Sequence, residues 1–307
     1  MMSLPTEPFP GAPESVRAEM LSIGPRWAED ITTNSQRVKD AYAPLLAQAP
    51  KTDISVMRDL AYGSHERQVL DIFWPPRPHA APVMVFVHGG AFVRGAKRVS
   101  DELYDNVLYW FARQGFVCVN VEYRLAPEAT YPQGALDVAA AMEWVHAEIG
   151  GYGGDNTRIL LVGHSAGGTH AAAYVFDPAV KQPACRAAAL VLISARLRAD
   201  QLPENPNRLG VQTYFGDDVA AYDAKSPVTY AHGSALPTMV VVAEYENPLL
   251  DLYGLEFAWR LAQSRGHAPR FLQMPNHNHM SIMAHFNSGE DILGRQIVTF
   301  FEAATAS

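Results

Sequence analysis

The sequence predicts an α/β protein in which a mostly parallel central sheet is covered by helices on both faces. Two observations predict this fold: strand-length apolar runs alternate with helix-length segments along most of the chain, and these runs are continuous. A continuous apolar run is typical of a strand that is buried on both sides, as in a parallel sheet between two helical layers. With 307 residues, 48% of them apolar, the chain is long enough for a sizeable core. Ligands of such sheets bind beyond the carboxyl ends of the strands, so functional residues are expected there.

The first fifty residues have a different pattern. Between residues 14 and 49 the apolar residues recur at helical spacing, Pro25 interrupts this pattern, and Pro50 ends it. We therefore expect two short amphipathic helices in residues 1–50, ahead of a main domain in residues 51–307.

The main domain is predicted to begin with an antiparallel pair of strands, at residues 54–63 and 67–75. Strand, loop and helix then follow one another several times. Further strands are expected at residues 81–90, 116–127, 158–168, 187–195, 237–246 and 269–279, with helices around 101–114, 134–148, 168–176, 251–265 and 290–303. Residues 196–234 break this rhythm with a polar connection that is too long for an ordinary loop. We expect a lid or pocket-wall insertion there.

Charge and composition exclude several classes of protein. The chain has 24 lysine and arginine residues against 32 aspartate and glutamate residues, a formal net charge of −8, which argues against a nucleic-acid partner. No segment is apolar over the length that spans a membrane, and the N-terminus lacks the pattern of a secretory signal. With only two cysteines, the sequence predicts a soluble cytoplasmic protein.

The stretch LLVGHSAGGTH, residues 160–170, places one serine between a predicted strand and a predicted helix. A sharp turn at this point requires very small residues two positions to either side, and Gly163 and Gly167 occupy them. Such a turn displays the hydroxyl of Ser165 above the sheet edge, near the positive end of a helix, as in the Gly-x-Ser-x-Gly nucleophile elbow. The pattern predicts Ser165 as a nucleophile.

A serine nucleophile needs a base, an orienting acid and donors for an oxyanion. The donors are expected in FVHGGAF, after an earlier strand, where glycines let the backbone approach a substrate oxygen closely. We expect the N–H groups of Gly90, Ala91 and Ala166 to form this oxyanion hole. Gly89 is expected to shape the loop.

The base and the acid are expected at the ends of the last two strands, in the chain order nucleophile, acid, histidine. The last strand ends in MPNHNHMS, where we favour His279 as the base over His277 because it lies further into the loop. The stretch VVVAEYENPLLD offers Glu246 as the acid that orients the imidazole, with Asp251 as the alternative.

Other residues near these motifs are given structural roles. His88 and His164 adjoin the motifs and are expected to position loops rather than to transfer protons. No cysteine or histidine spacing resembles a zinc site, and the chain lacks a phosphate-binding lysine loop and a dinucleotide fingerprint. We therefore expect neither a metal nor a cofactor.

In this order, HGGAF, VEYRLAPEATYP, GGDNTRILLVGHSAGG, AEYENPLLD and the terminal histidine loop resemble a known family. They are similar to the hormone-sensitive-lipase-like branch of the α/β-hydrolase esterases, close to bacterial carboxylesterases and arylformamidase-like enzymes. The resemblance covers roughly residues 55–303. It implies an α/β-hydrolase fold, an N-terminal helical cap, and a carboxylic-ester hydrolase with Ser165 as nucleophile, His279 as base and a carboxylate after the AEY strand.

The sequence departs from the family pattern at two points. Ala91 stands where the family usually has a third glycine, which matters little if only its backbone N–H is used. The usual acid segment AEYDPL is AEYENPL here, so alignment from the strand selects Glu246 and alignment from the proline selects Asn247. We favour Glu246 because the strand end sets the catalytic distance.

The expected reaction is hydrolysis of esters with small to medium acyl groups through an acyl-enzyme. The pocket wall is expected to contain Phe92, Tyr214, Met280 and Met283. The alternatives are an amidase of the arylformamidase type, which would use the same three residues, and a binding protein of this fold without activity. The sequence also allows a homodimer, formed through an edge strand or the terminal helix.

Overall fold

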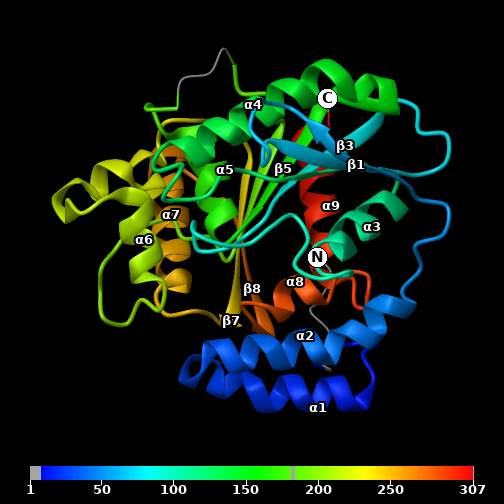
Figure 1. The fold of residues 1–307 in the computed structure, drawn as a ribbon, viewed down its shortest axis with the longest axis horizontal. Coiled ribbons are helices and arrows are strands. Elements are labelled where there is room, and N and C mark those ends of the chain that lie inside the picture. Colours follow the sequence, from blue (N-terminus) through cyan, green and yellow to red (C-terminus); the bar gives the residue numbers. More distant parts are fainter. Residues whose placement is uncertain (1–7, 181–183, 307) are drawn as a thin grey trace.

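An eight-stranded sheet runs through the middle of the protein (Figure 1). This computed structural model describes residues 8–180 and 184–306. The strand order is β1-β2-β4-β3-β5-β6-β7-β8. β2 pairs antiparallel with β1 and with β4, and every other pair is parallel, which confirms the predicted mostly parallel sheet and its leading antiparallel pair. The strands are β1 Ser55–Ala61, β2 Val69–Trp74, β3 Ala81–Val87, β4 Val117–Val121, β5 Gly154–His164, β6 Ala189–Ile193, β7 Thr238–Tyr245 and β8 Arg270–Asn278.

Helices follow most of the parallel strands, as the alternating pattern predicts. The α-helices are α1 Glu14–Ile23, α2 Ile31–Gln48, α3 Asp105–Arg113, α4 Gln133–Glu148, α5 Ala166–Phe176, α6 Arg208–Phe215, α7 Leu250–Arg265, α8 Ser281–Ala284 and α9 Ile292–Thr305. Short 3₁₀ turns are η1 Gly24–Glu29, η2 Ile149–Tyr152, η3 Val219–Ala221, η4 Asp223–Lys225 and η5 Pro227–Tyr230.

The sheet is buried on both faces, and alternate residues of one strand enter different cores. In β3, Val83, Val85 and Val87 face the layer that includes α4, α5 and α7, whereas Met84 and Phe86 face the layer that includes α3, α8 and α9. All five side chains are fully buried. Burial on both faces explains why these strands are continuous apolar runs in the sequence.

The N-terminal elements α1, η1 and α2 lie across the end of the sheet where β7 and β8 finish (Figure 1). Pro25 lies in the first turn of η1, between the two helices, and α2 ends two residues before Pro50. The carboxylate of Asp30 starts α2 by accepting a hydrogen bond from the N–H of Thr33 (3.0 Å). The three elements share a hydrophobic cluster that also includes Ala284 of α8, so they are packed onto the main sheet domain.

Residues 196–234 form a compact set of short helices, α6 and η3 to η5, rather than an extended loop. Tyr214, Phe215 and Tyr222 of this segment are buried in an aromatic cluster that also contains Phe92. The cluster attaches the segment firmly to the loop that follows β3.

Two fully buried histidines, His170 and His285, lie outside the strands. His170 of α5 contacts the rings of Tyr123 and Tyr214, and burial lowers its pKa to about 3. His285 follows α8, donates from Nδ1 to the carbonyl oxygen of Ser281 (3.2 Å), and burial lowers its pKa to about 4. Both imidazoles are therefore neutral in the folded protein near neutral pH.

We expect the free energy of unfolding to fall as the pH drops below about 6.5, the pKa of histidine in an unfolded chain. Between that pH and the lowered pKa values, the unfolded chain binds protons at His170 and His285 that the folded protein excludes. At a pH of about 5, each of these histidines lowers the free energy of unfolding by on the order of 2 kcal/mol. Urea unfolding near pH 7.5 and near pH 5 measures this loss. In a His285→Gln variant, the free energy of unfolding is expected to fall by about 2 kcal/mol less between the two pH values than in the parent protein. An equal difference in parent and variant would contradict the prediction.

Candidate active site

Ser165 lies at a sharp turn between the end of β5 and the first residue of α5. Its φ of 54° and ψ of −121° lie outside the regions that serine ordinarily adopts. A Cβ atom at Gly163 would lie 2.6 Å from Gly168 Cα, and one at Gly167 would lie 2.3 Å from the carbonyl oxygens of His88 and Val87. Only glycine fits at either position, as the sequence predicts.

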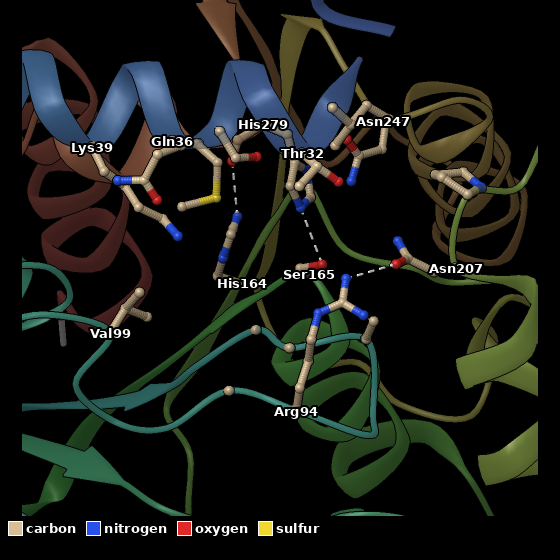
Figure 2. A pocket seen from close by; sticks show the side chains of 18 of the residues that line it. Thr32, Gln36, Lys39, Arg94, Val99, His164, Ser165, Asn207, Asn247 and His279 are labelled. Carbon is tan, nitrogen blue, oxygen red and sulfur yellow. Dashed lines mark hydrogen bonds between the residues drawn. The ribbon is translucent and has the colours of Figure 1, made fainter. Parts of the chain in front are cut away.

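A chain of hydrogen bonds joins the three residues that the sequence selects as nucleophile, base and acid. Nε2 of His279 lies 3.2 Å from Oγ of Ser165, a contact shown in Figure 2, and Nδ1 of His279 lies 2.8 Å from Oε2 of Glu246. Since the carboxylate can only accept at Nδ1, a neutral His279 carries its proton there and accepts the serine hydroxyl proton at Nε2. The side chains of His279 and Glu246 are buried, at 8% and 2% exposure.

The acid is held by the backbone at the end of β7. Oε1 of Glu246 accepts from the N–H of Ala243 (2.9 Å), and Oε2 accepts from the N–H of Asn247 (3.2 Å). The Asn247 side chain points elsewhere, because its Oδ1 accepts from Nε1 of Trp27 in η1 (2.9 Å). Asp251 lies in the first turn of α7. Of these candidates, the structure brings Glu246 to the imidazole.

His277 is separated from Ser165 by its own partners. Its Nε2 lies 2.9 Å from Oε1 of Glu290, and its Nδ1 lies 3.2 Å from Oγ of Ser281. β8 ends at Asn278, so His277 still lies within the strand, whereas His279 follows it and reaches Ser165 from the loop.

The loop after β3 passes directly over Ser165. A Cβ atom at Gly89 would lie 3.0 Å from Ser165 Cβ, and one at Gly90 would lie 1.8 Å from the carbonyl oxygen of Arg94. Gly90 has a φ of 153°, and Ala91, in the family's usual glycine position, has a φ of 50°. Gly89, Gly90 and Ala91 all line the same cavity as Ser165.

The fourth predicted oxyanion residue is Ala166, the first residue of α5. Its N–H has no acceptor within the helix, because the first turn of any helix leaves its amides unpaired. The amide therefore lies at the positive end of the α5 dipole, next to the hydroxyl of Ser165.

A buried carboxylate that the sequence analysis missed holds the loop that follows β3. Glu122, directly after β4, lies 2.8 Å from Nε2 of His88 and accepts from the N–H of Lys97 (2.9 Å) and from Arg67. Burial alone would raise the pKa of Glu122, but the hydrogen bonds from His88 and Lys97 and the nearby charges hold it below its ordinary value. Tyr123 adds a bond from its hydroxyl to the carbonyl oxygen of His88 (2.8 Å). A charged residue at the end of a buried strand was the available signal for Glu122.

A second missed connection runs through Tyr104 and His164. The hydroxyl of Tyr104 accepts from the N–H of Gly89 and lies 3.1 Å from Nδ1 of His164, whose Nε2 lies 3.2 Å from the carbonyl oxygen of His279. Burial lowers the pKa of His164, so the ring is neutral, and it donates from Nε2 because a carbonyl oxygen only accepts. His164 thus ties the loop of Gly89 to the loop of His279, consistent with the expected positioning role. Nothing local in the sequence indicates Tyr104.

The hydroxyl of Ser165 opens into a cavity of about 970 Å³ (Figure 2). One wall is the polar side of α2, and residues 196–234 add Pro206 and Asn207. Among the predicted wall residues, Met280 lines the cavity. The other three require a correction: Phe92 and Tyr214 stack on each other behind the wall (4.8 Å between ring centres), and Met283 is fully buried in the core beside α3 and α9. Their side chains fill gaps between elements that the sequence alone does not place.

The fold identifies the class of protein: the chain has the α/β-hydrolase fold. It matches the solved structure of a bacterial heroin esterase with a TM-score of 0.72 and 24% sequence identity, over 97% of this chain and 99% of that one. At this identity the likeness shows the fold.

Sequence comparisons add named relatives. The BD-FAE family matches residues 70–179. The chain is 39% identical to esterase LipC of Mycobacterium tuberculosis over 115 residues, 36% of this chain and 27% of LipC. It is 28% identical to esterase LipQ of the same organism over 239 residues, 72% of this chain and 56% of LipQ. The chain thus spans between about a quarter and about half of these curated relatives, and they confirm the resemblance to esterases of the hormone-sensitive-lipase-like α/β-hydrolase type.

Two searches of residues 8–180 and 184–306 bear on other classes of site. No helix in these ranges is long and apolar enough to cross a membrane. Within the same ranges, no group of three or more His, Cys, Asp or Glu side chains is arranged to hold a metal ion.

We expect Tyr104→Phe to lower the free energy of unfolding by about 2 kcal/mol, because the N–H of Gly89 and Nδ1 of His164 would both lose a buried partner. Tyr109→Phe is the matched control. Tyr109 is a residue of α3 that packs on the same cluster as Tyr104, and its hydroxyl makes no hydrogen bond to the described residues. Urea unfolding of both variants measures the difference. Equal stabilities would show that the Tyr104 hydroxyl does not support the site.

Proposed function

We propose that this protein is a serine hydrolase that cleaves carboxylic esters with small to medium acyl groups through an acyl-enzyme. The observation that carries the proposal is the hydrogen-bonded series Ser165, His279 and Glu246, which opens into a cavity beside the loop of Gly90 and Ala91. A buried histidine between a carboxylate and a serine hydroxyl is the arrangement that activates serine as a nucleophile.

In the proposed mechanism, His279 takes the hydroxyl proton through Nε2 while the oxygen of Ser165 attacks the ester carbonyl. Glu246 keeps the imidazole in the required tautomer and stabilises its protonated form. The amides of Gly90, Ala91 and Ala166 stabilise the negative charge on the carbonyl oxygen. His279 then protonates the departing alcohol, and a water molecule, activated by the same imidazole, releases the acid from Ser165. The 3.2 Å contact between His279 and Ser165 is expected to shorten when substrate binds.

The cavity and the relatives support the choice of substrate class. A cavity of about 970 Å³ with polar groups of α2 along one side suits a compact, partly polar ester better than a long acyl chain. LipC and LipQ are both named as esterases, and the segment of this chain that the BD-FAE family matches, residues 70–179, includes the serine turn. An amidase would use the same groups, and a binding protein without activity would have no need for an aligned base and acid. The cytoplasmic location and the homodimer stay predictions.

The role of Ser165 can be tested with 4-nitrophenyl acetate. We expect a burst of 4-nitrophenol equal to the enzyme concentration, followed by slower turnover, because deacylation limits the reaction of an activated ester. Ser165→Ala is expected to lose the burst and to lower kcat by about 10⁴-fold or more. Similar kcat values for the two proteins would contradict the assignment of the nucleophile.

The choice of acid can be tested with one pair of variants. Glu246→Gln is expected to lower kcat by about 10³- to 10⁴-fold, because an amide cannot hold the productive tautomer of His279. Asp251→Asn, in the first turn of α7, is the control and should change kcat by less than about twofold. Steady-state kinetics with one ester measures both, and a large loss in Asp251→Asn alone would reverse the assignment.

A further inference from the structure

The cavity above Ser165 has a polar wall. The start of α2 contributes Thr32, Thr33, Ser35 and Gln36, all side chains that hydrogen-bond. Ile31 also lines the cavity, whereas the buried apolar residues of α2, Val38, Tyr42 and Leu46, belong to the cluster that joins the N-terminal elements to α8. The wall is therefore suited to a substrate that carries polar groups in addition to its ester.

Two cationic side chains enter the same cavity from different elements. Figure 2 shows Lys39 reaching in from α2 and Arg94 from the loop that follows β3, with Ser165 between the two elements. The guanidinium of Arg94 is held by one neutral partner, since its Nη2 donates to Oδ1 of Asn207 (3.1 Å). The remaining N–H groups of that fork are free to bind another acceptor in the cavity.

Neither cation is neutralised by the described residues. No aspartate or glutamate of residues 8–180 and 184–306 lines the cavity, and neither Lys39 nor Arg94 forms an ion pair within those ranges. Asp40, the acid next to Lys39 in the chain, accepts instead from Nε2 of Gln36 (2.8 Å). By contrast, Arg37 of the same helix is paired with Glu19 (2.7 Å).

We propose that the natural substrate carries a second, unreacted anionic group, such as a carboxylate, which binds between Lys39 and Arg94 while the ester lies at Ser165. This proposal rests on the proposed ester hydrolysis. In a chain with a net charge of −8, two unpaired cations in one cavity produce a local positive potential that attracts an anionic ester. The guanidinium fork matches the two oxygens of a carboxylate, and the ammonium adds a point charge.

Matched pairs of esters test the proposal and show on which side of the ester the charge lies. Mono-4-nitrophenyl adipate and its methyl ester differ in a charge on the acyl side, and 4-acetoxybenzoate and its methyl ester differ in a charge on the alcohol side. For each compound, kcat/KM is divided by the rate at which hydroxide hydrolyses the same compound. The readout is the ratio of this value for the acid to this value for its methyl ester. In at least one pair we expect this ratio to exceed about ten, and to fall as salt is added, because salt screens the attraction.

Charge-removing variants assign the preference to residues. Lys39→Met and Arg94→Met are each expected to lower the ratio by about fivefold to tenfold. Arg98→Met is the matched control, because Arg98 is an exposed cation of the same loop that does not line this cavity. A ratio near one in both pairs, or a ratio that both variants leave unchanged, would overturn the proposal.

A binding measurement separates this proposal from the proposed function. Calorimetry on Ser165→Ala with the acid and with its methyl ester reports recognition without turnover. If the parent protein hydrolyses the neutral esters but Ser165→Ala binds acid and methyl ester equally, the esterase function stands and the proposal of an anionic substrate is overturned. If the parent protein hydrolyses none of the four esters, the proposed function fails. Calorimetry then decides alone. Tighter binding of the acid than of its methyl ester supports the anion site if the difference disappears when Lys39→Met is added to Ser165→Ala. Equal binding of the two compounds overturns it.

Discussion

The whole site depends on one backbone turn, in which Ser165 keeps a positive φ between a central strand and a helix. The turn is held from both sides, because β5 lies between β3 and β6 and the N–H of Ser165 donates to the carbonyl oxygen of Ile193 (3.0 Å). Gly167 packs against the backbone of β3 so closely that no side chain fits there. The strain at Ser165 is thus maintained by the packing of the sheet, and the turn leaves the half-buried hydroxyl facing the cavity.

The other groups of the site are attached to this turn by buried polar contacts. Glu122 holds the loop after β3 from the end of β4, and Tyr104 and His164 join that loop to the loop of His279. A satisfied buried network of this kind is rigid, since breaking any contact leaves a polar group without a partner. Part of the cavity wall comes from α2 and from residues 196–234, outside the sheet. Of the two residues proposed for selectivity, Lys39 belongs to α2, whereas Arg94 belongs to the loop after β3 that also carries Gly90 and Ala91.

Most of the fold could be predicted from the sequence, because the signals are local. Continuous apolar runs predict strands buried on both faces, and the structure has them in a sheet that is parallel beyond β4. The glycines around Ser165 predict the sharp turn. At Gly163 the contact that excludes a side chain is local, with Gly168, whereas at Gly167 it comes from the backbone at the end of β3. Selecting Glu246 and His279 was also within reach, because side chains that follow adjacent parallel strands meet at one edge of the sheet.

Contacts between distant segments were beyond reach of the sequence. Phe92 and Tyr214 were expected at the cavity wall, but they stack behind it, since their directions depend on how α6 packs against the loop after β3. Lys39 and Arg94 lie 55 positions apart in the chain and enter one cavity only when α2 covers the sheet edge. By itself, the sequence determined the order of strands and helices and the turn at Ser165, because neighbouring residues act on one another through the backbone. The tertiary structure alone decided which side chains face Ser165, because that depends on packing between elements far apart in the chain.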